Sequence, residues 1–256
     1  MRLLILSLLL GGCAVQPGGN RDVRATNGND YRAQVHTDLA ASYYSRGQLA
    51  VALEELTRAT RADAGYAPAY NMLGLVNGEL HEDQRAEMNF RRAIELSPQL
   101  SEARNNFGLF LCQRKRMQEA HLQFETALAD PLYATPEKAL SNAGACSLEE
   151  GDVAGAERYF QRATKQAPNH ASAQLGLAEV LFRQGHWLAA RGQLRRLSEQ
   201  TELNAQGLWL GLRIERRLGD HEAEANYDAQ LHRRYPESMQ TQWLTIGQYD
   251  QVGSLL

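Results

Sequence analysis

The sequence predicts an all-α protein, a solenoid of about six stacked helix hairpins closed by a C-terminal cap. Within each unit, apolar residues recur at helical spacing on both sides of a short break. The composition is rich in helix formers, and there are only seven prolines. The strongest observation is a period of 34 residues, with a slip of two before the third copy, which indicates stacked units rather than one globular core. The ladder consists of Gly74, Ala86, Phe90 and Ala93, then Gly108, Ala120, Phe124 and Ala127, then Gly144, Ala156, Phe160 and Ala163.

The chain opens on a segment that has the features of an export signal. Met1–Arg2 carries one positive charge, and the apolar run Leu3–Leu10 that follows is too short to span a bilayer. Leu10–Cys13 resembles the bacterial lipoprotein cleavage box. This resemblance implies that residues 1–12 are a lipoprotein signal peptide and that Cys13 is acylated. The alternative is an ordinary signal peptide with an incidental cysteine.

Residues 13–30 are predicted to be the lipidated cysteine and a flexible tether, because Gly, Asn and Asp dominate this stretch. Such a tether extends about 20–25 Å. Ala14, rather than Asp, follows the cysteine, and the sorting rule of enterobacterial lipoproteins then implies a lipid-anchored protein of the outer membrane that faces the periplasm.

Residues 31–237 are predicted to hold the six repeats. Each repeat is expected to be a hairpin whose glycine at the break adopts the left-handed conformation, as at Gly47, Gly151, Gly185 and Gly219. Small residues allow the two helices to approach closely, and the aromatic residue fills the space toward the next unit. No hairpin buries its apolar face alone, so stacking supplies the core. The predicted units are 33–66, 67–100, 101–134, 137–170, 171–203 and 204–237.

Residues 238–256 fall outside the period and are predicted to be a cap and tail. Trp243, Leu244 and Ile246 are expected to form a short helix over the exposed end of the stack. Residues 247–256 are expected to be frayed.

The pattern resembles the tetratricopeptide repeat, which implies a right-handed superhelix whose first helices line a concave groove. A heptad coiled coil is the alternative, but it requires a period of seven throughout. In the tetratricopeptide register, amides one repeat apart at Asn71 and Asn105 suit a peptide backbone, because each amide both donates and accepts. Alternatively, Asn105 only orders its own helix. The predicted partner-binding residues are Asn71, Leu75, Asn105, Leu109, Ser141, Leu148, Leu175 and Phe182.

Cys112 and Cys146 lie in the first helices of neighbouring repeats. We expect two buried free thiols, with a disulfide as the alternative in an exported protein. Neither cysteine has the spacing of a metal site.

The sequence carries no support for catalysis or for nucleic-acid binding. The net charge of −3 gives no electrostatic case for nucleic acid. There is no phosphate-binding glycine loop, nucleophile elbow or His-Glu-x-x-His motif. We therefore expect neither an enzyme nor a cofactor, metal or small-molecule substrate.

Several segments together resemble the PilF/PilW family of type IV pilus biogenesis lipoproteins. This resemblance implies a pilotin that binds the secretin subunit of the pilus channel and promotes its outer-membrane localisation and multimerisation. The alternative is a repeat lipoprotein that serves another envelope complex, in outer-membrane protein insertion or cell-wall enzyme coordination. The segments are Asn105–Gln113, Asp130–Tyr133, Asn142–Gly144, Leu203–Ala205, Leu210–Ile214 and Arg234–Pro236.

Overall fold

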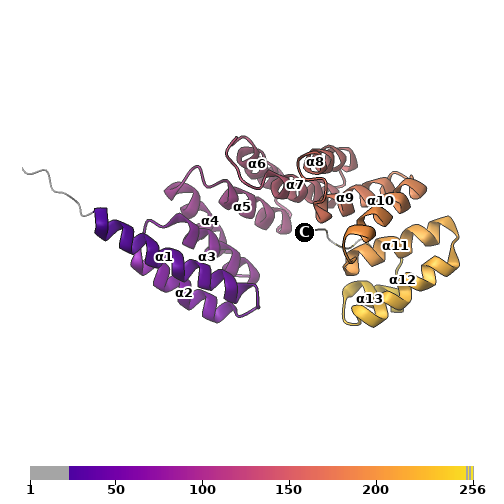
Figure 1. Ribbon diagram of the computed structural model, residues 1–256, viewed down its shortest axis with the longest axis horizontal. Helices are drawn as coiled ribbons and strands as arrows, with labels where there is room; N and C mark the ends of the chain where they lie inside the picture. The colour runs from indigo at the N-terminus through magenta and orange to yellow at the C-terminus, as the bar shows by residue number, and fades with distance from the viewer. Residues whose placement is uncertain (1–22, 252, 254, 256) are drawn as a thin grey trace, which may run out of the picture.

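The computed structural model describes residues 23–251, 253 and 255, and in this part of the chain it has thirteen helices and no strand. The helices form six antiparallel hairpins and a final short helix, stacked into a curved solenoid (Figure 1). The predicted fold class is confirmed. The hairpins are α1 (Val23–Tyr44) with α2 (Leu49–Ala62), α3 (Ala67–Glu79) with α4 (Asp83–Leu96), α5 (Ser101–Gln113) with α6 (Met117–Leu128), α7 (Pro136–Glu150) with α8 (Val153–Gln166), α9 (Ala171–Arg183) with α10 (Trp187–Gln200) and α11 (Ala205–Leu218) with α12 (His221–Arg234), followed by α13 (Met239–Thr245).

The first helix starts earlier than the sequence predicts. The sequence predicts a tether that extends to residue 30, whereas α1 begins at Val23. Extending a helix that is already anchored adds one hydrogen bond for each residue fixed, so packing of the later part of α1 on α2 supports the turns before it. Arg32 also reaches back along α1, where its Nε lies 3.4 Å from the carbonyl oxygen of Gly28. The signal peptide at 1–12, Cys13 and the rest of the tether lie outside the described residues.

The turn inside each hairpin contains one residue with positive φ. Glycine occupies it at four of the predicted breaks, and His81 and Lys115 adopt the same conformation, with φ of 58° and 61°. The six positions follow the 34-residue ladder and its slip, so one turn geometry serves every repeat. They are Gly47, His81, Lys115, Gly151, Gly185 and Gly219.

The core of repeats two, three, four and six is built on a glycine that faces an aromatic ring. A Cβ at Gly74 would lie 2.6 Å from the ring of Phe90, and one at Gly108 would lie 2.7 Å from that of Phe124. Only a residue without a side chain allows the two helices to approach this closely. Phe90 also contacts the next repeat, with its ring centroid 5.5 Å from that of Phe107. The aromatic residue therefore fills the space between units, as the sequence predicts.

The C-terminal end of the stack is closed by α13 and by the residues after it. Leu244 is buried, and Trp243 packs against Trp209 of α11 with ring centroids 5.9 Å apart. Ile246 is 64% exposed and takes no part in the cap. Among residues 23–251, no helix has both the length and the hydropathy needed to cross a membrane.

Candidate protein-binding face

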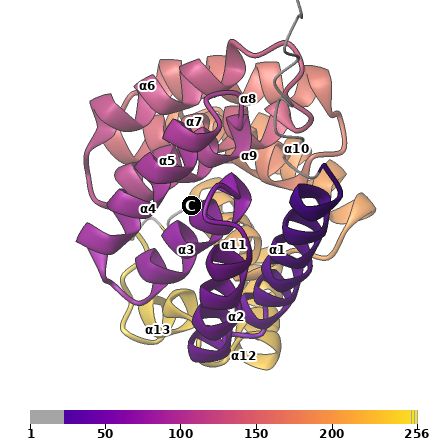
Figure 2. The same cartoon turned by 90° about the vertical axis from the view of Figure 1, so that its left-hand side faces the viewer.

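The first helices of the hairpins line the inner side of the curve. Figure 1 shows α5, α7 and α9 on the inner side, with α6 and α8 outside them. In the view turned by 90°, the hairpins follow one another around a curve (Figure 2). A concave face of this kind is the extended binding surface that solenoids offer.

The predicted binding residues divide into two groups by exposure. Asn71, Leu75, Leu109 and Phe182 are half-buried, so part of each residue remains exposed. The other four are buried beneath the inner face, where they support it. These are Asn105, Ser141, Leu148 and Leu175, with 3%, 4%, 4% and 7% of their surface exposed. Their role in binding stays a prediction.

Four side-chain amides form a hydrogen-bonded chain across three repeats. Asn106 Nδ2 donates to Asn71 Oδ1 over 3.2 Å, and Asn105 Nδ2 lies 3.5 Å from Asn106 Oδ1. Asn142 Nδ2 then donates to Asn105 Oδ1 over 3.0 Å. The amides predicted to receive a peptide thus bond to one another between α3, α5 and α7. They fix the relative position of the inner helices, and Asn71 at the end of the chain keeps exposed atoms.

A disulfide between Cys112 and Cys146 joins α5 to α7. The expectation of two free thiols is therefore wrong. Both residues are fully buried, with Cα atoms 5.9 Å apart, within the usual range for a disulfide. The paired cysteines are 34 residues apart, whereas equivalent positions on α5 and α7 differ by 36, so the bond joins positions that are offset by two residues in the repeat register.

Buried charges connect the inner helices of repeats five and six. Glu179 in α9 is fully buried and accepts hydrogen bonds from Arg183 over 2.9 Å and from Arg213 of α11 over 3.2 Å. Burial lowers the pKa of Arg213, although the Glu179 carboxylate opposes the shift. Arg213 also lies 4.4 Å above the ring of Phe182. The guanidinium is therefore paired and stacked, and it remains charged.

The end of the chain returns to the inner face of the last two repeats. Trp209 Nε1 donates to the carbonyl oxygen of Gln251 over 2.9 Å, and Gln206 Nε2 donates to that of Gly253 over 3.2 Å. Leu255 packs against the apolar clusters of repeats four to six. The expectation that residues 247–256 are frayed is wrong for the described residues among them. Two side chains of α11, Gln206 and Trp209, thus hold this segment.

Comparison with known proteins identifies the repeat and its family. Residues 67–100 and 147–208 match the tetratricopeptide repeat. The type IV pilus assembly protein PilF of Pseudomonas aeruginosa is 29% identical over 93% of this chain and 94% of its own length. The solved structure of P. aeruginosa PilF has a TM-score of 0.73 and 28% identity, covering 86% of this chain and 99% of that one.

A second solved structure decides the assignment. PilW, described as a widely conserved type IV pilus biogenesis factor, is 31% identical over 83% of this chain and 98% of its own, with a TM-score of 0.73. The chain belongs to the PilF/PilW family. The predicted family and the predicted repeat are confirmed.

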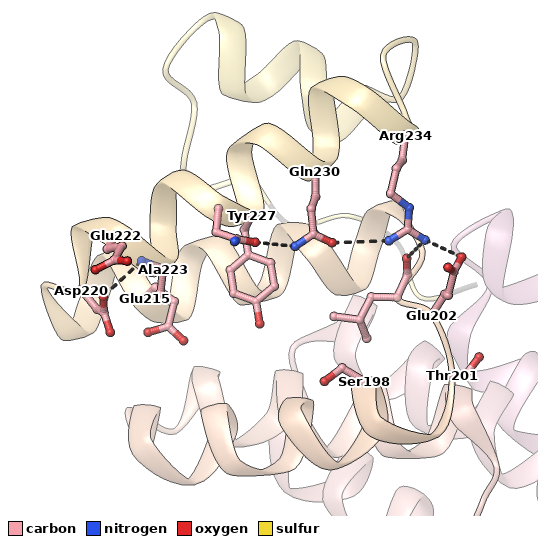
Figure 3. A pocket seen from close by; sticks show the side chains of 12 residues that line it. Ser198, Thr201, Glu202, Glu215, Asp220, Glu222, Ala223, Tyr227, Gln230 and Arg234 are labelled. Carbon is pink, nitrogen blue, oxygen red and sulfur yellow. Dashed lines mark hydrogen bonds and ion pairs between the residues drawn. The ribbon is translucent and has the colours of Figure 1, made fainter.

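In this PilF/PilW family member, a cavity of about 620 Å³ opens between α10 and α12 (Figure 3). Arg234 donates to Glu202 over 2.9 Å and to the Leu203 carbonyl over 3.2 Å at one end of the cavity. At the other end lie the carboxylates of Glu215 and Asp220, which are both paired with Arg191. Burial raises the pKa of Tyr227, which lies between the two ends. Arg234 and Arg191 thus pair with the carboxylates at the two ends of the cavity.

Two features of this PilF/PilW protein's inner face were missed from sequence. Asn106 and Asn142 complete the amide chain, and they are equivalent positions once the slip of two is counted. Two asparagines at equivalent positions of neighbouring inner helices could have indicated that their amides belong to one hydrogen-bonded chain. The segment 249–255 gave no such signal, because its contacts involve two backbone carbonyls and join residues up to 47 apart in sequence.

Proposed function

We propose that this protein is a lipid-anchored assembly factor for a type IV pilus, a pilotin for the secretin of the pilus channel. The observation that carries this proposal is its similarity, over nearly the whole chain, to PilF and PilW, which are named as a pilus assembly protein and a pilus biogenesis factor. The inner face supports it further, because concave repeat surfaces bind segments of other proteins.

The mechanism that we propose is tethering without a chemical reaction. Acyl chains on Cys13 hold the protein at the periplasmic side of the outer membrane, since two or three buried chains anchor stably where one does not. The inner face holds a segment of the secretin subunit. Holding the client at the membrane raises its effective concentration there, which favours its insertion and its assembly into a ring.

The client is expected to contact the exposed atoms of the inner face. Asn71 of α3 supplies an amide at one end of the chain of hydrogen-bonded asparagines. Leu75 of α3 and Leu109 of α5 supply apolar surface. Asn71→Ala together with Leu109→Ala should weaken client binding in a folded protein. Met88→Ala is the matched control, because Met88 is 64% exposed on the second helix of its hairpin, away from the inner face.

Deletion of the gene, followed by separation of heat-resistant secretin multimers on a gel, tests the function. The proposal expects fewer multimers at the outer membrane, and restoration by the wild-type chain. Cys13→Ala should give a folded protein that leaves its client mislocalised. Normal multimers in the deletion strain would contradict the pilotin role. If deletion instead impaired outer-membrane protein insertion or cell-wall enzymes, it would support a scaffold of another envelope complex.

A further inference from the structure

The C-terminal segment of the chain lies on the inner face in the manner of a bound peptide. The carbonyl oxygens of Gln251 and Gly253, two residues apart, both accept side-chain hydrogen bonds from α11. Carbonyls at alternate residues face one side when a chain is extended. One donor, Gln206, is itself held by Gln240 of α13 over 3.0 Å. Recognition through the main chain is how extended peptides are bound without regard to their full sequence.

Side chains at the two ends of the segment add specificity. Tyr249 stacks on Trp209 with centroids 6.3 Å apart and an interplanar angle of 10°, and the Arg216 guanidinium lies 3.7 Å from its ring centroid. Six residues later, Leu255 packs between the apolar clusters of repeats four to six. Between them Gly253 is buried, and a Cβ there would lie 1.8 Å from Gln206 Oε1. The segment thus has an aromatic anchor, a close backbone approach and an apolar anchor.

The surroundings of the aromatic anchor are basic. Phe182, Arg213, Arg216 and Arg217 line a cavity of about 260 Å³ together with Tyr249 and Asp250. Arg217 lies 3.4 Å from the Asp250 carboxylate, which is 96% exposed. An ion pair this exposed contributes little to stability. Its effect is on selectivity, because the arginines favour an acidic residue at this position of a bound segment.

We propose that the inner face of α9 and α11 is a binding groove for an extended peptide that carries an aromatic residue followed by an acidic residue, with an apolar residue six positions after the aromatic one. Tyr249–Gln251, Gly253 and Leu255 occupy this groove in the free protein, and a client segment of the same chemistry displaces them. This inference rests on the proposed function only in taking the client to be a protein.

Peptide binding in trans tests the proposal. The probe is a fluorescent synthetic peptide of residues 247–256, and the protein is the full chain carrying Tyr249→Ala and Leu255→Asp, which releases both anchors. We expect this variant to bind the probe at least tenfold more tightly than the wild-type chain, where the resident segment competes at high effective concentration. Gln248→Ala is the matched control, because Gln248 is exposed and should leave binding at the wild-type level.

Two further arms define the groove. A probe with Ala in place of Tyr and Lys in place of Asp should bind the Tyr249→Ala, Leu255→Asp chain at least tenfold more weakly than the native probe does. Adding Arg216→Ala to that chain should weaken binding of the native probe by a similar factor. A chain ending at Ile246 is a second way to vacate the groove. The proposal is overturned if a released chain with native helical content does not bind the probe, or if the wild type binds it equally well. It is also overturned if neither released chain folds, because the segment would then be part of the core.

This assay does not involve the secretin. Failure of the pilotin role would leave the peptide result unchanged, and failure of peptide binding would leave the multimer result unchanged.

Discussion

At the scale of single residues, the turn inside each hairpin requires a left-handed backbone, which glycine adopts more readily than other residues. His81 adopts φ of 58° there, at a cost of about 1–2 kcal/mol for a residue with a side chain. His81→Gly should therefore stabilise the protein by about 0.5–1 kcal/mol, after the entropy of glycine in the unfolded chain is counted. The neighbouring Leu80→Gly is the control and should destabilise, because Leu80 has an ordinary φ of −77°. Urea unfolding checks both, and a loss of stability in His81→Gly would contradict the reasoning.

The glycines that face aromatic rings behave in the opposite way. A Cβ at Gly108 would lie 2.7 Å from the fully buried Phe124 ring and 3.1 Å from the backbone oxygen of Ala120. Gly108→Ala should lower the free energy of unfolding by about 1–2 kcal/mol, because overpacking outweighs the gain in helix propensity. Gly192→Ala is the matched control, since nothing lies within 4 Å of a Cβ there, and it should be stabilising. Equal effects of the two substitutions on the thermal midpoint would refute this.

Glu87 links repeats two and three through charge. Hydrogen bonds from Arg116 and then Arg91 hold the pKa of Glu87 below its ordinary value of 4.5. A depressed pKa in the folded state gives stability that is present above pH 4.5 and is lost as the pH falls through the folded value. Glu87→Gln should therefore lower the melting temperature at pH 7, and the gap to wild type should narrow toward pH 3. A gap that is constant with pH would show that the charge is not the cause.

At the scale of elements, the disulfide is the strongest single link between helices. Closing a loop of 34 residues is worth about 3–4 kcal/mol by the chain-entropy relation. Cys112→Ser with Cys146→Ser should remain helical and lose about this much in urea unfolding. In a chain carrying Cys13→Ser, thiol titration under native, non-reducing conditions should detect no free thiol, and only reduction should release two. Two titratable thiols before reduction would contradict the pairing.

Helices were more predictable from sequence than the contacts between them. The starts of α3, α5 and α9 coincide with the first residues of the predicted units, because the 34-residue period fixes where these units begin. The pairing of Cys112 with Cys146 was not derivable, because it depends on how two inner helices cross after the slip. The early start of α1 was missed because Asn27, Gly28 and Asn29 are poor helix formers.

At the scale of the whole molecule, stability is expected to vary along the stack. Each repeat contacts only its neighbours, so terminal repeats lose one interface. Hydrogen exchange should be slowest in α5 and α7, which share the disulfide and the amide chain, and should quicken toward α1 and α12. Mass spectrometry of peptic fragments measures this gradient. Uniform protection from α1 to α12 would indicate one cooperative unit instead.

The candidate binding face was predictable in outline and not in detail. The register located the first helices on the inner side, and Asn71 and Phe182 on these helices are half-buried. It could not indicate that Asn105 bonds to Asn106 and Asn142, because amide pairing depends on side-chain rotation as well as position. The repeat register also could not predict that the end of the chain lies on α11, because residues 238–256 fall outside the 34-residue period.

The bond between Cys112 and Cys146 also determines how this chain carries mechanical load. If the N-terminal end of the chain and a bound client pull in opposite directions, tension passes from α5 to α7 through the sulfur atoms. The 34-residue loop between them, which includes α6, then bears no force. Such a loop would otherwise add about 110–120 Å of extended chain. The segment between Cys112 and Cys146 therefore cannot be extended by force while the disulfide is intact. Any extension under load occurs in the repeats on either side of it.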